Sequence, residues 1–192
     1  MKKTTRIPAL CVVVAALLLL GGYGTAFGQG QLNFTTYNAT NASLGEVFQS
    51  DGTTPAANGT FSAQLYGSTT GLAGSFASIS TVTTFLSGLP GYINYGGITL
   101  PTASGNEIGA TYYYELLVWT ASAGSYAAAQ TINGDQYGTS QVVSLILGGD
   151  INHFAQDTSG FNNLTLTLVP EPATCALMGL GGLSLLLFRR RK

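Results

Sequence analysis

The chain has 192 residues, of which 45% are hydrophobic and only 8% charged, against about 25% charged in a typical soluble protein. Its seven Lys and Arg residues all lie within the first six or the last four positions, so residues 7–170 hold no Lys or Arg and seven of the eight acids, a formal charge of −7 with His neutral. Because a domain without Lys or Arg cannot neutralise phosphates, this composition excludes nucleic acid as a partner.

The N-terminal 28 residues have the three parts of a secretory signal. Three cations are followed by an apolar run at residues 9–20. Small residues come next, and Ala26 and Gly28 form an A-x-G cleavage site before Gln29. We therefore expect residues 1–28 to be a signal peptide that directs the chain to Sec-type export machinery and is then removed. The alternative is an uncleaved N-terminal anchor.

Residues 29–168 are long enough to form one independent domain, and their composition favours strands. Residues with high strand propensity are common, and Gly, Pro and Asn interrupt them at short intervals. In segment 61–66 the apolar residues Phe61, Ala63 and Leu65 share one face, and segment 112–120 has the strongest strand composition. Further strands are predicted at 32–37, 79–86, 92–100, 141–147 and 163–169, and a short helix at 125–132.

The series of short alternating segments predicts a mainly β fold, an antiparallel sandwich or a jelly-roll-like domain. In the last segment Leu164, Leu166 and Leu168 are expected to face one way. No cysteine lies within 31–169, so the domain must be stable without a disulfide.

No arrangement in the domain indicates catalysis. The one histidine, His153, lies in a polar loop and is not accompanied by a G-x-S-x-G nucleophile motif. Glu107 and Glu115 are two acids of the kind that glycoside hydrolysis needs, but nothing in their spacing selects them. We expect no enzyme activity and no cofactor.

Two binding sites remain as alternatives. Asp150, Asn152 and Asp157 supply oxygens of the kind that Ca²⁺ prefers, although their spacing differs from an EF-hand and is equally typical of turns. An exposed tyrosine face on segment 112–120 would stack on sugar rings in a carbohydrate-binding module that recognises extracellular polysaccharide. The aromatic residues considered for that contact are Tyr112, Tyr114 and Trp119. Core packing is the alternative explanation for these rings.

The C-terminal residues 173–188 form a 16-residue apolar run. As a helix it would be about 24 Å long, which is short for a membrane span but sufficient with local thinning. It ends in four consecutive cations, which would remain cytoplasmic and keep residues 29–170 on the far side. These membrane-stop residues are Arg189, Arg190, Arg191 and Lys192.

The segment before this run completes a known pattern. Val169, Pro170, Glu171 and Pro172, followed by the Gly- and Leu-rich span and the basic tail, resemble the PEP-CTERM sorting signal. The resemblance covers 169–192 and implies that the chain is a substrate of exosortase, a membrane-embedded protease-transpeptidase. The two prolines hold the motif extended. Segments 63–67 and 112–130 are also similar to the ectodomains of secreted PEP-CTERM proteins from Verrucomicrobia-like bacteria.

These observations together predict an exported, non-enzymatic protein of the cell surface or extracellular matrix. The apolar run would anchor it in the membrane until an exosortase acts on residues 169–172.

Overall fold

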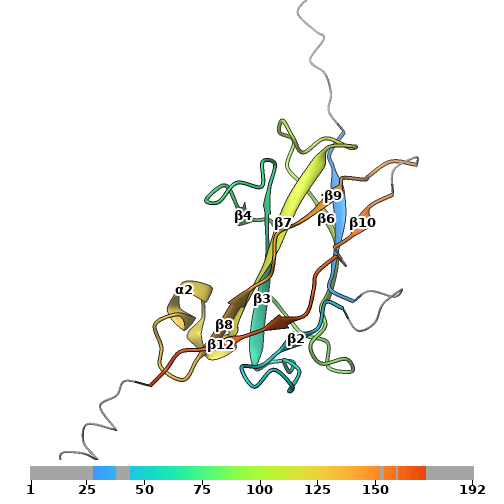
Figure 1. The fold of residues 1–192 in the computed structure, drawn as a ribbon. Coiled ribbons are helices and arrows are strands. Elements are labelled where there is room, and N and C mark those ends of the chain that lie inside the picture. Colours follow the sequence, from blue (N-terminus) through green and yellow to red (C-terminus); the bar gives the residue numbers. More distant parts are fainter. Residues whose placement is uncertain (1–27, 38–43, 152–153, 159, 172–192) are drawn as a thin grey trace, which may run out of the picture.

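The computed structural model describes residues 28–37, 44–151, 154–158 and 160–171, and this part of the chain is mainly β (Figure 1). Two short helices, η1 (Ala121–Ala123) and α2 (Tyr126–Ala129), lie near the middle of the chain. The strands are β1 (Gln31–Thr35), β2 (Val47–Phe48), β3 (Phe61–Ser68), β4 (Ala77–Ser78), β5 (Thr83–Thr84), β6 (Asn94–Thr99), β7 (Thr111–Thr120), β8 (Gln136–Thr139), β9 (Val143–Ile146), β10 (Gln156–Asp157), β11 (Leu164–Thr165) and β12 (Thr167–Leu168).

The main sheet is antiparallel and is built on two long strands. Its order is β12-β8-β7-β3-β4, with β5 also beside β3 and β9 also beside β7. β3 and β7 pair without a register shift from Phe61 opposite Thr120 to Ser68 opposite Tyr113. The mainly β, antiparallel prediction is therefore confirmed.

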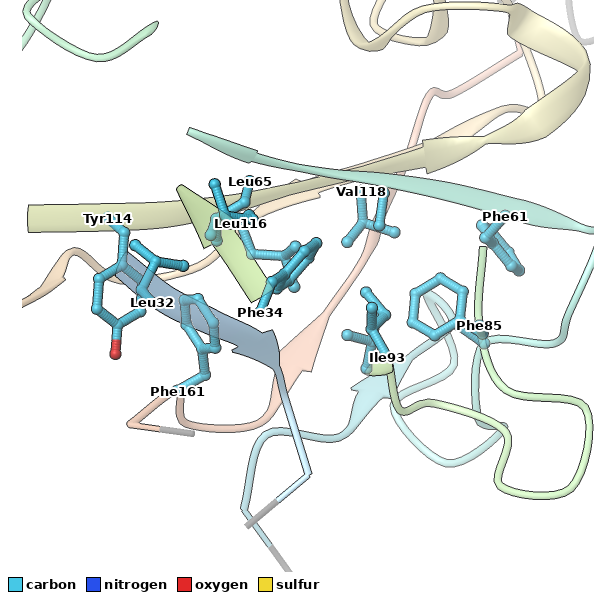
Figure 2. Packing of buried hydrophobic residues seen from close by; sticks show 14 of the residues in the cluster. Leu32, Phe34, Phe61, Leu65, Phe85, Ile93, Tyr114, Leu116, Val118 and Phe161 are labelled. Atoms are coloured by element: carbon cyan, nitrogen blue, oxygen red, sulfur yellow. The ribbon is translucent and has the colours of Figure 1, made fainter. Parts of the chain in front are cut away.

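A second layer covers one face of this sheet. It consists of a three-stranded sheet, β10-β1-β6, and a short pair, β11-β2. β1 pairs antiparallel with β6 but parallel with β10, and β2 pairs parallel with β11. In Figure 2, Phe34 of β1 lies beside Leu65 and Leu116 from the main sheet, which makes the domain a two-layer sandwich.

The core between the layers follows from the strand alternation. The inward residues Phe61, Ala63 and Leu65 of β3 are at most 2% exposed, as the period-two pattern predicts. On β7 the even-numbered residues from 112 to 118 face the same core. Full burial of one such apolar side chain stabilises the fold by about 1.5–3 kcal/mol.

The opposite face of the main sheet has a smaller apolar cluster, which α2 covers at one end. Leu117, Trp119 and Ala129 are its buried members. Ser125 is the N-cap of this helix and has an extended backbone. Its Oγ accepts a hydrogen bond from Ala128 N at 3.2 Å, which satisfies one N–H of the first turn. A helix was predicted at 125–132, and the structure confirms it over Tyr126–Ala129.

Ser140 holds the corner where the neighbour of β7 changes from β8 to β9. Its Oγ accepts a hydrogen bond from Leu116 N at 2.9 Å and donates one to Gln141 O at 2.8 Å. Ser140 N in turn donates to Leu116 O at 2.9 Å. The corner therefore satisfies the N–H of Leu116, in the middle of β7, which neither β8 nor β9 reaches.

Two sequence predictions were wrong in detail. The strand predicted at 79–86 is absent as a unit, because β4 and β5 pair separately with different parts of β3. Leu168 does not share the inward face of Leu166: it is 46% exposed, whereas Leu166 is 2% exposed. The chain changes partner at Leu166, from β2 to β8, and this change breaks the alternation.

Candidate functional site

A polar pocket lies at one end of the sandwich, between the main sheet and the second layer. The ends of β3 and β4 form one side, and the end of β6 with the loop that follows it forms the other. The pocket has a volume of about 390 Å³. Its walls carry Ser68, Thr69, Ser75, Ser78, Thr99, Asn106 and Tyr112 among the polar residues, with apolar surface from Ile79 and Leu100.

Asn106 is the most informative residue of this pocket. It is 8% exposed, and its Nδ2 donates a hydrogen bond to Pro101 O at 3.0 Å. Its Oδ1 is buried and accepts no hydrogen bond from the described residues. An acceptor in this state costs about 1–3 kcal/mol when nothing pairs with it.

Tyr112 reaches the same pocket from β7. Its ring lies against the backbone of Gly67, where an added Cβ would stand 2.6 Å from the tyrosine Oη. Glycine is therefore required at position 67 for the ring to fit. Burial raises the pKa of Tyr112, and its hydroxyl makes no hydrogen bond within the part of the chain that the structure describes.

The three aromatic residues predicted for sugar contact all lie inside the protein. Tyr112 and Tyr114 face the core at 4% and 1% exposed, and Trp119 is 2% exposed in the cluster under α2. Burial raises the pKa of Tyr114 to about 12, partly offset by a backbone hydrogen bond with Gly160. The exposed tyrosine face expected from the sequence is thus not formed by these rings, and of the three residues Tyr112 alone lines the pocket.

Two of the three residues predicted to bind calcium, Asp150 and Asp157, lie among the described residues. Asp157 lies on β10, where its Oδ1 accepts a hydrogen bond from Asn33 Nδ2 at 3.2 Å, and Asp150 is exposed in the preceding loop. Asn152 and His153 lie outside the described residues. Within those that are described, no group of three or more His, Cys, Asp or Glu side chains comes together.

The two acids weighed for hydrolysis have different surroundings. The Oε2 of Glu107 accepts a hydrogen bond from Gly105 N at 2.7 Å. Glu115 lies on the outer face of β7, in a groove of about 500 Å³ that also has Tyr66, Phe76 and Val142 in its walls. Burial raises the pKa of the Glu115 carboxyl.

The last described residues leave the sheet at the predicted sorting motif. Val169 is still part of the fold, because its N–H donates to Asp135 O at 2.8 Å and its carbonyl accepts from Gly134 N at 3.1 Å. Pro170 and Glu171 follow and are exposed. The folded domain therefore stops where the extended motif begins.

Comparison with protein families decides what this terminus is. Residues 168–192 match the family model of the PEP-CTERM protein-sorting motif. The chain carries a PEP-CTERM sorting signal. No match was found among curated proteins or solved structures.

The PEP-CTERM signal implies an exosortase as partner, and it implies export with a location in the cell envelope or at the surface. Its predicted span 173–188 and its basic residues lie outside the described residues, as do Pro172 and the predicted signal peptide up to position 27. Among the described residues, no helix is long and apolar enough to cross a membrane. Gly28, at the predicted cleavage site, is exposed.

Asn106 and the serines of the pocket were not predicted from the sequence. The segment Pro-Thr-Ala-Ser-Gly-Asn at 101–106 is typical of a loop. Nothing in it indicates that the last side chain is buried with an unpaired acceptor. The loop is held by a contact distant in sequence: Gly30, just before β1, donates its N–H to Asn106 O at 2.8 Å.

Proposed function

We propose that this protein is an exported, non-enzymatic protein of the cell surface or extracellular matrix, which an exosortase processes at residues 169–172. The observation that carries the proposal is the PEP-CTERM match at 168–192, which begins at the last residue of β12. Sec-type export through residues 1–28 and temporary anchoring by residues 173–188 complete the route.

The structure supports this route by how it presents the motif. Two backbone hydrogen bonds fix Val169, and Pro170 and Glu171 after it are exposed, with the φ of Pro170 fixed by its ring. A protease binds its substrate as an extended strand, so a motif that is held out from a folded domain is well suited to recognition.

A non-enzymatic role is supported by the surroundings of the acids. Glu107 is engaged with the backbone of its own loop. Glu115 is set apart on the outer face of the sheet, beside aromatic and aliphatic side chains.

Intact mass and C-terminal peptide mapping test the proposal, on protein recovered from the membrane and from the medium of the native host. We expect a mature chain that ends within 170–172. Replacing Pro170, Glu171 and Pro172 by alanine should leave the full chain in the membrane. Thr167→Ala, an exposed change on β12, is the matched control and should be processed normally.

Two results would overturn parts of the proposal. A wild-type chain that keeps Arg189–Lys192 in the membrane would mean a permanent anchor. A hydrolytic activity that is lost in Glu115→Gln or His153→Ala would mean that the domain is an enzyme.

A further inference from the structure

We propose that the polar pocket at the end of the sandwich binds a neutral sugar ring, with Asn106 Oδ1 and the Tyr112 hydroxyl as its hydrogen-bonding partners. This inference concerns the folded domain alone and does not rest on the sorting proposal.

The polarity of the site is set by Asn106. Since Nδ2 is used by Pro101 O at 3.0 Å, the amide orientation is fixed and Oδ1 is the atom that remains. It is a buried acceptor without a partner among the described residues. Buried polar groups in folded proteins are nearly always hydrogen-bonded, to protein or to water, so Oδ1 needs a donor, which a ligand hydroxyl that displaces a water from the pocket can supply.

Tyr112 adds a second group of different character. Tyr112 lines the same pocket, its Oη lies against Gly67 of the pocket wall, and its hydroxyl has no hydrogen bond within the described residues. A phenolic hydroxyl both donates and accepts. A ligand that satisfies both residues must therefore offer a donor and an acceptor close together, as the neighbouring hydroxyl groups of a sugar do.

Charge excludes most other polar ligands. No charged side chain lines the pocket, and a charged group buried without a partner is strongly disfavoured. Anions are further disfavoured by the seven acids and the absence of bases over residues 7–170. The ligand is thus expected to be uncharged.

The size and walls fit a sugar ring. A volume of about 390 Å³ falls within the range of small-molecule sites, roughly 300–1,000 Å³. Ile79, Leu100 and the Tyr112 ring supply apolar surface for the C–H face of a ring. Ser78 and Thr99 are exposed, so the pocket opens to solvent beside them and a longer glycan can extend outward.

The pocket is held in shape by hydrogen bonds on both sides. Asn106 is fixed through its backbone by Gly30 and by Ala103, at 2.8 and 3.0 Å. Across the pocket, Ser68 Oγ lies 2.5 Å from Ser75 Oγ and accepts from Gly71 N at 3.1 Å. A site that is already ordered loses little entropy when it binds.

An array of defined oligosaccharides, probed with the full chain in detergent, tests the inference. The array contains neutral glycans and matched glycans in which one sugar is replaced by its uronic acid. We expect binding to neutral glycans and weaker binding to each acidic counterpart. Calorimetric titration of the best neutral glycan then gives the affinity for the variants.

Tyr112→Phe is the decisive variant, because it removes one hydroxyl that bonds to nothing in the protein. We expect it to weaken binding about three- to tenfold, the value of one hydrogen bond, while the unfolding transition is unchanged. Tyr114→Phe is the matched control: it lies on the same face of β7, outside the pocket, and should leave binding unchanged. Asn106→Ala should weaken binding by about tenfold or more.

The remaining outcomes would overturn the inference. An array without any bound glycan would mean that the pocket holds only water. Equal affinity in wild type and Tyr112→Phe, or a preference for uronic acids, would mean that glycans bind elsewhere.

Discussion

The two faces of β7 differ in how completely they are covered. On the inner face, the even-numbered residues from 112 to 118 pack against the second layer along nearly the whole strand. On the outer face, Leu117 and Trp119 are buried under α2, but Glu115 borders an open groove. One strand thus builds a continuous core on one side and only a local cluster on the other.

The difference shows what each face contributes. The inner face is closed by strands that come from both ends of the chain, so it fixes the overall fold. The outer face is closed by one helix of four residues and by aromatic edges: Tyr126 stands at 82° to Trp119 and at 86° to Tyr137, with centroids 6.4 and 5.9 Å apart. Such edge-on pairs add about 0.5–1.5 kcal/mol each.

The largest expected effect comes from a matched pair of core truncations. Leu116→Ala should cost about 4 kcal/mol of unfolding free energy, because the inner face cannot collapse onto the cavity. Leu117→Ala, its neighbour on the outer face, should cost about 2–3 kcal/mol, because the groove beside it lets the surface relax. Urea unfolding followed by the fluorescence of Trp119, the single tryptophan, measures both. Equal costs would mean that the two faces are closed equally well.

A smaller effect is expected at the corner between β8 and β9. Ser140→Ala removes the acceptor of Leu116 N and leaves a buried N–H unpaired, at a cost of about 1–3 kcal/mol. Ser144→Ala, exposed on β9, should change stability by less than about 0.5 kcal/mol. Amide hydrogen exchange at Leu116 gives a second reading, and slow exchange in the variant would contradict this role of Ser140.

The smallest effect is expected at Glu115. Burial raises its pKa above the ordinary 4.5, so the folded state holds this proton more tightly than the unfolded state. Its contribution to stability is therefore present in full below pH 4.5 and is lost as the pH rises through the folded pKa. Glu115→Gln lacks that loss and should be more stable than wild type at pH 7 by a few tenths of a kcal/mol, because the half-exposed carboxyl is largely screened.

Urea unfolding of wild type and Glu115→Gln at pH 7 and at pH 4 measures this difference. It should shrink at the lower pH, where wild-type Glu115 gains its proton. A variant that is less stable at pH 7 would show that the outer groove stabilises the carboxylate.

The sequence predicts the long strands well, because the alternation of inward and outward side chains is a local pattern that does not depend on which strands pair with them. Alternation placed Tyr112 and Tyr114 on one face and Tyr113 and Trp119 on the other, as observed. Three of the two-residue strands, β2, β4 and β10, were not predicted. β2 and β10 are strands because β11 and β1 run beside them, and parallel partners far apart in sequence leave no local signal.

The two candidate sites, the sorting motif and the pocket, also differ in how far the sequence predicts them. The sorting motif is readable because three parts occur in fixed order at the terminus, and the family model matches there. The pocket could not be predicted, because the loop that carries Asn106 is held by Gly30, more than seventy residues earlier in the chain. Tyr112 was selected as an exposed ring, whereas the structure buries the ring and makes Tyr112 part of the pocket wall.

The two backbone hydrogen bonds at Val169 attach the first residue of the sorting motif directly to the folded domain. Val169 lies near the Thr120 end of β7, because Leu168 pairs with Gln136, whose N–H donates to Thr120 Oγ1. The pocket lies at the Tyr112 end, about 26 Å away along the strand, and the described chain ends leave from opposite ends of the sandwich (Figure 1). In a protein anchored through residues 173–188, as proposed, the pocket would therefore lie at the end of the domain remote from the anchor.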